Sequence, residues 1–584
     1  METLKYSEIL QQNQLLKGIQ KGAPYKISVL SNVTINSIKE IVEYSLRTNH
    51  INPSITLGNY DNIIQDSAKQ TDADLVIVFF DMLNIVDSVA AFFENLNDEQ
   101  YSNLKDKVCS EIDMILENLK HCPSVVFNTF SSAYFISNYS HKSKIETFVS
   151  ELNRHLDERK SINVSLLNID KIFSKIGIKQ AIDYRMYNSS KAPYTLSFLK
   201  NYTAAVEPII FRNTGRLKKA VIFDCDNTLW KGIIGEDGMD KIDMSGSSHA
   251  GHFYNKVQQI AVYLSRQGVI VGICSKNNEQ DVNDVLLGHP DIILKDEYIS
   301  IKKINWNDKA ANLTAIASEL NIGLDSIVFI DDSAFEINLI KEQLPEIVSL
   351  QVPSAIYEYP DFLLENIYRH FNFTLNSEDA KKTEIYKQQS ERESDKKNHK
   401  SIDEYLSSLS ISLTVSKDDL AQVSRIAQLT QKTNQFNLTT KRYTENQILN
   451  MMNSSTEHVF AVSVKDKFGD NGLTAVCIIK TDLQNKNVYC IDTFLMSCRI
   501  IGRNIEFVFM DYIMSWLNVK SPAAIVTAEY MPTNKNEQVQ NFYISNGFTL
   551  MNEKEGTKAY SLELSKYQPK NITYIRTSFQ GGKN

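Results

Sequence analysis

Apolar runs of strand length alternate with stretches of helical periodicity over the first two hundred residues. The apolar runs lie at 27–30, 75–80, 124–127 and 164–167, and the helical stretches between them include 37–46 and 101–119. Strands that alternate with helices are typical of a parallel sheet with helical crossovers. We therefore expect an α/β domain over residues 1–215.

The alternation starts again after Lys219. Runs that read as buried strands lie at 220–223, 269–273, 291–294 and 326–330, and amphipathic stretches separate them. This pattern predicts a second α/β domain over residues 216–375.

Beyond residue 376 the pattern changes. Residues 378–401 are rich in Lys, Glu, Gln, Ser and Asp, which predicts a solvated linker at 376–405. Apolar runs then surround a helical stretch at 505–517, and they lie at 411–415, 459–464, 474–480, 488–494 and 525–528. We expect an α+β domain over 406–567 and a tail at 568–584.

Composition narrows the class of protein. A chain of 584 residues suits two to four domains of roughly 100–200 residues each. A net charge of −8 disfavours nucleic acid as the main partner. The seven cysteines are few and odd in number, which indicates a reducing compartment. The sequence has no signal-like segment and no apolar run of membrane-spanning length. We therefore expect a cytoplasmic protein without a membrane partner.

Acidic pairs follow two of the predicted strands in the second domain. Asp224 and Asp226 come directly after 220–223, and Asp331 and Asp332 end the run at 326–330. Ligands of open α/β sheets collect beyond the carboxyl ends of the strands. Carboxylates this close repel one another unless a cation lies between them, and hard oxygen ligands suit Mg²⁺, so the pairs predict a magnesium-dependent phosphoryl site.

Two further features occur in the same order along the chain. The run 269–273 continues into Ser275, Lys276 and Asn277, which can hold phosphate oxygens. Lys309 begins a predicted helix and can supply a positive charge to the same phosphate. Lys302 and Lys303 compete with Lys309 for this role. A single strand-terminal Asp often only caps the next helix, but four features in series indicate a catalytic site.

These motifs resemble those of the haloacid-dehalogenase-like (HAD) phosphatase superfamily over residues 219–353. The resemblance implies a Rossmannoid fold, with little or no cap because few residues separate Trp230 from the next helix. It makes Asp224 the nucleophile and Asp226 the general acid and base. Mg²⁺ would be held by Asp224, the Asp226 backbone carbonyl and the acidic pair Asp331 and Asp332. The phosphoryl group would be bound by Thr228, Ser275, Lys276, Asn277 and Lys309.

The third domain carries a second set of motifs. Residues 499–504, with Arg499 and Arg503, resemble the pyrophosphate loop of GNAT-type acyltransferases, although Asn504 stands where a small residue is expected, and 541–548 resembles their closing motif. A polar loop that opens a helix is suited to bind an anion. Cys498, beside Arg499, is a candidate acyl relay; the alternative is a small packed residue.

Taken together, motifs from both domains resemble the FkbH-type glyceryl-transferase/phosphatase family over about 219–548. The stretches that carry this likeness are DCDNTLWKGIIGEDG, ICSKNN, FIDDSAFE, QLTQKTNQFNL, LMSCRIIGR and EYMPTNKN. The resemblance implies that the glyceryl unit of 1,3-bisphosphoglycerate is loaded onto the phosphopantetheine thiol of an acyl carrier protein, with loss of the phosphate. The glyceryl-S-carrier product would feed polyketide-type metabolism.

The first domain resembles the SGNH-hydrolase-like domain that often precedes the phosphatase in that family. Ser31 follows the first strand, but the Gly-Asp-Ser block is absent and Asp183 has no histidine three residues later. Because a serine nucleophile would lack its base, we expect a scaffold or a carrier-docking domain.

Two alternatives stay open. The first is a free-standing phosphatase of a small phosphate ester with structural flanking domains. The second is a binding protein with a vestigial acidic site. The presence of Asp224, Asp226, Lys309 and Asp331 argues against the second alternative.

Overall fold

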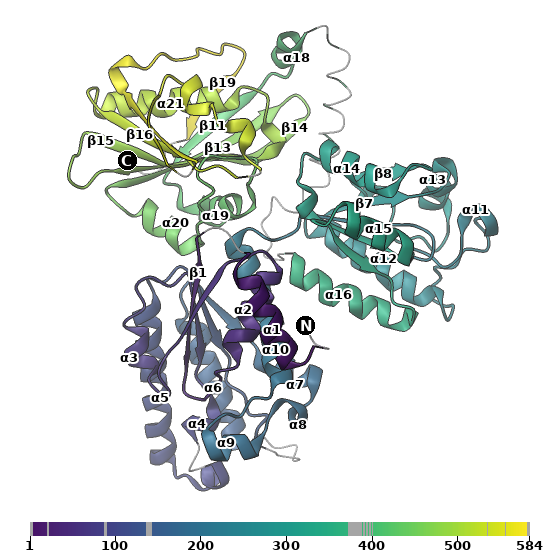
Figure 1. Ribbon diagram of the computed structural model, residues 1–584, viewed down its shortest axis with the longest axis vertical. Coiled ribbons are helices and arrows are strands. Elements are labelled where there is room, and N and C mark those ends of the chain that lie inside the picture. The colour runs from purple at the N-terminus through teal and green to yellow at the C-terminus, as the bar shows by residue number, and fades with distance from the viewer. Residues whose placement is uncertain are drawn as a thin grey trace. The chain divides into compact units, whose positions relative to one another are not determined.

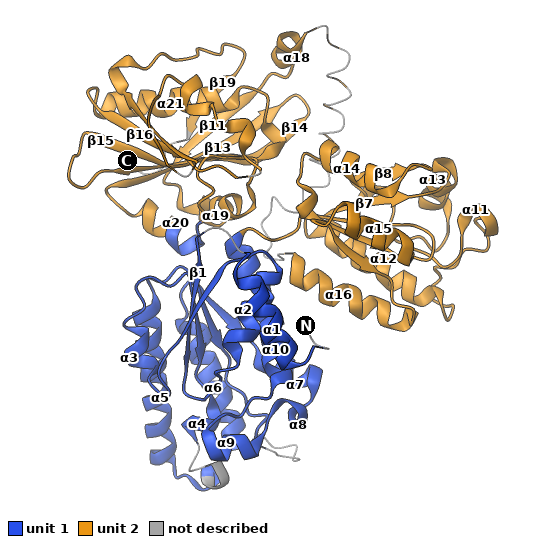
Figure 2. Cartoon of the chain, in the orientation of Figure 1, with its two compact units in different colours: residues 1–214, 443–447 blue, residues 215–442, 448–584 orange. Residues whose placement is uncertain are grey.

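The computed structural model describes residues 4–19, 23–86, 90–135, 143–371, 388, 392, 395, 399, 401–533, 535–554 and 556–580. The chain forms two compact units, residues 1–214 with 443–447 and residues 215–442 with 448–584 (Figure 2). The predicted second domain falls within the second unit, and so does the predicted third domain apart from residues 443–447. Figure 1 shows the chain coloured from the N-terminus to the C-terminus and labels many of its helices and strands.

The first unit is built on a parallel sheet. Its five strands have the order β2-β1-β3-β4-β5, and they are β1 (Tyr25–Ser31), β2 (Pro53–Leu57), β3 (Leu75–Phe79), β4 (Val125–Asn128) and β5 (Val164–Leu167). The sequence prediction of four of these strands is confirmed. It missed β2, an edge strand in which only Pro53 and Ile55 are buried, because so short an alternation is a weak signal.

Helices precede, connect and follow these strands. They are α1 (Tyr6–Lys17), α2 (Ile38–Thr48), α3 (Ile63–Ser67), α4 (Met82–Ile85), η1 (Ala90–Asn95), α5 (Asp98–Leu119), α6 (Lys144–Arg159), α7 (Ile169–Ile176), α8 (Ile178–Ala181), α9 (Tyr184–Ser190) and α10 (Leu196–Thr214). The predicted helices at 37–46 and 101–119 correspond to α2 and α5.

The second unit contains a second parallel sheet. Its order is β10-β9-β6-β7-β8, with β6 (Ala220–Phe223), β7 (Ile270–Ser275), β8 (Ile301–Ile304), β9 (Ile327–Asp331) and β10 (Val348–Gln351). The associated helices are α11 (Ile234–Asp237), α12 (Gly251–Arg266), α13 (Glu279–Gly288), η2 (Asp296–Tyr298), α14 (Lys309–Glu319), η3 (Leu324–Ser326), α15 (Ala334–Gln343), η4 (Ile356–Glu358) and α16 (Tyr359–His370).

Helices cover both faces of this sheet. Val221 and Phe223 of β6 pack into a core with α12, α13 and α16, whereas Ala220 and Ile222 pack into a core with α14 and α15. Alternate strand residues point to opposite faces, so a strand buried on both sides is apolar throughout. Between β6 and α12 the only helix is the four-residue α11, so the chain inserts no large domain over the carboxyl end of β6.

The strand predicted at 291–294 is wrong. Ile292 and Leu294 are buried, but the backbone N–H groups of Ile293 and Leu294 donate to Oε1 of Gln258, at 2.8 and 3.1 Å, instead of to a neighbouring strand. The strand at this edge is β8, whose two lysines hide it from a search for apolar runs. The apolar residues in this stretch are therefore explained by the burial of Ile292 and Leu294, and not by a strand.

The rest of the second unit is a mixed sheet. Its order is β17-β18-β16-β15-β14-β13-β11-β19, and β12 pairs with β15. The strands are β11 (Ser412–Lys417), β12 (Phe436–Asn437), β13 (Glu457–Asp466), β14 (Gly469–Thr481), β15 (Val488–Met496), β16 (Ile525–Tyr530), β17 (Thr549–Lys554), β18 (Thr557–Glu563) and β19 (Arg576–Gln580). All five strands predicted for this region are present.

Within this sheet β15 and β16 separate partway along. Their parallel pairing covers only Val488 to Ile491, and β12 pairs instead with the last residues of β15, Leu495 and Met496.

The helices of this region are α18 (Ile402–Ser408), η6 (Leu420–Gln422), α19 (Val423–Lys432), α20 (Glu445–Met452, which begins in the first unit), η7 (Cys498–Ile500), α21 (Ile505–Lys520), η8 (Glu537–Val539), α22 (Phe542–Ser545) and η9 (Leu564–Lys566).

Most of the predicted linker at 376–405 lies outside the described residues. Arg392, inside it, is not solvated: it is 1% exposed and donates to both carboxylate oxygens of Asp466, at 2.9 and 3.0 Å. Among the residues described, no helix is both long and apolar enough to cross a membrane.

Candidate active site

The predicted catalytic residues meet at the carboxyl edge of the second parallel sheet. Asp224 follows β6, Ser275 ends β7 and Asp331 ends β9. Because β6 lies between β9 and β7, these three positions are neighbours along the edge. The local sequence determines each strand, and the order of the strands in the sheet brings their carboxyl ends together.

Lys309, the first residue of α14, links two of these strand ends. Its Nζ lies 2.6 Å from Oδ2 of Asp331 and 3.1 Å from Oδ1 of Asp224. All three side chains are buried, and Asp331 is fully inaccessible to solvent. Of the three candidate lysines, Lys309 lies beside these aspartates, whereas Lys302 pairs with Asp296 at 2.6 Å and Lys303 pairs with Glu319.

Three carboxylates at this edge fit a divalent cation. Oxygens of Asp224, Asp331 and Asp332 lie within 4.8 Å of one another. Asp224 Oδ1 is buried, and among the described residues its charged neighbour is Lys309, whose Nζ lies 3.1 Å away. A buried carboxylate oxygen in that state is suited to ligate a metal. The Asp226 carboxylate does not belong to this group.

Burial and charge perturb the carboxylates. Burial raises the pKa of Asp224 to about 7, the charge of Asp331 adds to the shift, and Lys309 opposes it. Burial and then Asp331 also raise the pKa of Asp332. Burial works against the ammonium of Lys309, yet the charges of Asp224 and Asp331 raise its pKa. A cation beside the pair would favour the ionised carboxylates.

Asp226 is oriented by three donors. Its Oδ1 accepts from Trp230 Nε1 at 2.9 Å and from the Ile234 N–H at 3.1 Å, and its Oδ2 accepts from Asn277 Nδ2 at 2.9 Å. Asn277 also donates to Ser275 Oγ at 3.1 Å. The sequence prediction assigned Asn277 to phosphate. In the structure its amide donates to the carboxylate predicted to move the proton, and its role at a phosphate stays a prediction.

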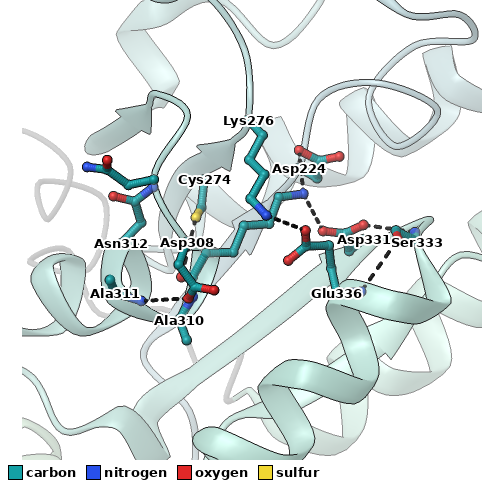
Figure 3. A network of polar contacts seen from close by, with 12 residues as sticks. Asp224, Cys274, Lys276, Asp308, Ala310, Ala311, Asn312, Asp331, Ser333 and Glu336 are labelled. Atoms are coloured by element: carbon teal, nitrogen blue, oxygen red, sulfur yellow. Dashed lines mark hydrogen bonds and ion pairs between the residues drawn. The ribbon is translucent and has the colours of Figure 1, made fainter.

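Two other predicted phosphate ligands have different surroundings. Lys276 Nζ lies 2.6 Å from Oε1 of the buried Glu336 on α15, a partner that the sequence prediction missed (Figure 3). Thr228 is fully buried, and its Oγ1 has no hydrogen-bond partner among the described residues. Ser275 is also buried at the edge.

The predicted residues of the third domain do not join this site. Cys498 and Arg499 line a cavity with Lys218, Lys219 and Ser326, which precede β6 and β9 and so mark the opposite end of the sheet from Asp224. Arg503 is buried and donates to Asp466 Oδ2 at 2.8 Å and to the carbonyl of Arg499 at 2.6 Å. Arg503 therefore takes part in a buried ion pair, and its predicted role at a phosphate stays a prediction.

The first unit has no triad among its described residues. Ser31 Oγ donates to the Val33 carbonyl at 2.7 Å, and Asp183 accepts from backbone N–H groups that open α9. The buried Asp81 at the end of β3 accepts a hydrogen bond from Tyr134 at 3.0 Å and a second from Tyr194.

No protein-family model matches the chain, and no curated protein matches it. Among solved structures, the N-terminal part of the protein BF1531 from Bacteroides fragilis, which contains a phosphatase domain and was crystallised with Mg, is similar at 21% identity. The match has a TM-score of 0.55 and covers 64% of this chain and 100% of that one.

Two acetyltransferases match more weakly. They are a putative GNAT-family acetyltransferase from Desulfovibrio desulfuricans (12% identity, 26% of this chain and 99% of that one) and the ribosomal-protein-S18-alanine N-acetyltransferase from Escherichia coli (12%, 27% and 98%), each with a TM-score of 0.21. That score is too low to assign a fold. The chain is a mixed α/β protein with two parallel sheets and one mixed sheet, and its similarity to the Bacteroides structure is one of fold.

Proposed function

We propose that the chain is a Mg²⁺-dependent phosphatase of the HAD type. The observation that carries the proposal is the Asp224, Lys309 and Asp331 cluster, in which a buried ammonium bridges two carboxylates that end neighbouring strands. Bound Mg²⁺, held by Asp224, Asp331 and Asp332, would offset the charge of the transferring phosphoryl group. The magnesium in the similar Bacteroides structure supports this choice of metal.

Each step of the reaction has a residue in place. Asp224 attacks phosphorus, and the bond from phosphorus to the substrate oxygen breaks as Asp226 protonates that oxygen. Water then attacks phosphorus, Asp226 takes its proton, and the bond to Asp224 breaks to release phosphate. Lys309 stabilises the charge on the phosphoryl oxygens in both steps.

The narrower proposal is glyceryl transfer to an acyl carrier protein. The thiol sulfur of the phosphopantetheine arm attacks C1 of 1,3-bisphosphoglycerate: a C–S bond forms, the C–O bond to the C1 phosphate breaks, and the thiol proton goes to the departing phosphate. In the route through Cys498, the Cys498 thiol makes this attack first. The phosphopantetheine thiol then attacks the Cys498 thioester, its C–S bond forms as the bond to Cys498 breaks, and its proton returns to the Cys498 sulfur. The acyl phosphate is already activated, whereas the C3 phosphate ester needs the Asp224 site. The motif series of both domains supports this proposal, including its GNAT-like third domain and SGNH-like first domain.

The general proposal is tested with the full-length enzyme and p-nitrophenyl phosphate. Asp224→Asn should lower kcat by at least about 10³-fold, because the nucleophile is lost. Asp240→Asn, in an exposed turn of the same domain, is the matched control. Activity that survives in Asp224→Asn would contradict the assignment.

The narrower proposal is tested by the intact mass of a phosphopantetheinylated carrier protein incubated with enzyme, Mg²⁺ and 1,3-bisphosphoglycerate. A glyceryl adduct with the wild type, a phosphoglyceryl adduct with Asp224→Asn and no adduct with Cys498→Ala support transfer through Cys498. A carrier that stays unmodified while small esters are hydrolysed supports the alternative, a phosphatase of small phosphate esters.

A further inference from the structure

Three apolar residues lie exposed around the candidate active site. Trp306 and Phe335 are the two most exposed of the described Trp, Tyr and Phe residues, at 75% and 70%, and Ile233 is 38% exposed. Folding normally buries aromatic rings, because each ring removes a large apolar area from water. Exposed apolar side chains that gather at one place indicate a surface that a ligand or a partner covers.

Trp306 lies in the segment between β8 and α14. The residue before it, Asn305, donates its N–H to the carbonyl of Ser275 at 3.1 Å. Three residues after it, Lys309 forms the ion pair with Asp224. The backbone of Trp306 is therefore held at the carboxyl edge of the sheet, between two residues of the site.

Phe335 and Ile233 have the same relation to the site. Phe335 is the second residue of α15 and precedes Glu336, which pairs with Lys276 at 2.6 Å (Figure 3). Ile233 precedes the backbone N–H that donates to Asp226 Oδ1 at 3.1 Å. The three apolar residues thus come from the segments that follow β6, β8 and β9 at one edge of the sheet. We call them the apolar rim.

A bound substrate would place its leaving group towards this rim. Asp224 and Lys309 are buried at the sheet edge, so a phosphoryl group that they hold is covered on the side of the sheet. In-line attack by Asp224 places the leaving oxygen on the opposite side, which is the side of the solvent. Between β6 and α12 the chain forms only the four-residue α11, so no inserted domain encloses the leaving group there.

We propose that the apolar rim binds the leaving group of the substrate, and that the phosphatase therefore prefers esters whose alcohol extends from the site as an apolar chain or ring. The proposal rests on the proposed function, because it names the substrate class of the same site. Apolar contact of this kind is made equally in the ground state and the transition state, so it lowers KM and raises kcat/KM with little change in kcat.

The test compares ethyl phosphate with hexyl phosphate, using the full-length enzyme with Mg²⁺ and a phosphate-release assay. The two alcohols are almost equally acidic, so the chemical step is equally demanding and the difference between the esters measures apolar contact. We expect kcat/KM to be at least about tenfold higher for hexyl phosphate, mainly through a lower KM, because the longer chain removes more apolar area from water. Equal values for the two esters would overturn the proposal.

Variants locate the contact at the rim. Trp306→Ala and Phe335→Ala should each lower the ratio of kcat/KM for hexyl phosphate to that for ethyl phosphate by about threefold to tenfold, and Trp306→Phe should restore most of it. Leu287→Ala removes a side chain of α13 that is as exposed, at 78%, and is the matched control. A ratio that stays high in both rim variants, or that falls equally in the control, would overturn the proposal.

The fluorescence of Trp306 measures binding without turnover. In Asp224→Asn, hexyl phosphate should shift the tryptophan emission to shorter wavelength, because the chain excludes water from the exposed ring, and adding Trp306→Phe should abolish the shift. The absence of a shift would overturn the proposal. Hydrolysis of neither ester would contradict the phosphatase assignment, whereas equal hydrolysis of both would contradict the rim alone, so the two failures give different results.

Discussion

Lys309 Nζ lies 2.6 Å from Asp331 Oδ2, so the first residue of a helix neutralises the last residue of a strand 22 positions later. The same ammonium is 3.1 Å from the predicted nucleophile, Asp224. One buried cation thus joins three elements, β6, β9 and α14, at the edge where the phosphoryl group would be held.

Replacing this lysine should abolish most of the proposed phosphatase activity. We expect Lys309→Met to lower kcat by about 10²–10³-fold, the usual effect of removing one preorganised donor from a site of charge development. Steady-state release of phosphate measures it. Lys303→Met, which removes a lysine paired with Glu319 instead, should keep full activity. If both variants lose activity equally, Lys309 has no special role.

Asn277 should act by positioning Asp226. Asn277→Ala removes one of three donors to that carboxylate, and we expect kcat to fall about tenfold or more with KM nearly unchanged, since small misplacements of a catalytic group slow the chemical step. The neighbouring Asn278, which caps α13 and accepts from the Gln280 N–H, is the control as Asn278→Ala. A change in KM alone would show that Asn277 binds substrate instead.

Arg392 should stabilise the fold. It and Arg503 both donate to Asp466, whose side chain is fully buried, so Arg392→Ala leaves part of a buried charge uncompensated. We expect a loss of about 3–5 kcal/mol in the free energy of unfolding, measured by urea denaturation. Lys465→Ala, which breaks the exposed pair with Asp470, should cost less than about 1 kcal/mol. Equal losses would contradict the assigned role.

His370, at the end of α16, should make stability depend on pH. Burial, with the charges of Arg369 and Lys218, lowers its pKa from 6.5 to about 3. Between these two pH values the unfolded chain binds a proton at this histidine and the folded chain does not. The free energy of unfolding is therefore highest above pH 6.5 and decreases as the pH falls towards 3. His370→Gln should weaken the fall in urea midpoint between pH 7 and pH 5. The exposed His121→Gln should leave that fall unaltered.

The sequence by itself determined the elements that carry the chemistry. An apolar run followed by an acidic pair, as at Asp224 and Asp331, is a local signal, because a strand buried on both faces must be apolar and its polar end must lie at the sheet edge. The strands β6, β7 and β9 and the helix that begins at Lys309 are all where the pattern placed them.

Only the tertiary structure decided which side chains meet. Gln258, and not a neighbouring strand, accepts the backbone N–H groups of residues 293 and 294. Glu336 pairs with Lys276, and Asp466 pairs with Arg503. Asn277 donates to Asp226. Each partner is distant in sequence or on another element, so no local pattern marks it. The placement of Cys498 at the opposite end of the sheet from Asp224 has the same cause: a parallel sheet has two ends, and the chain's path between elements selects the one that each residue faces.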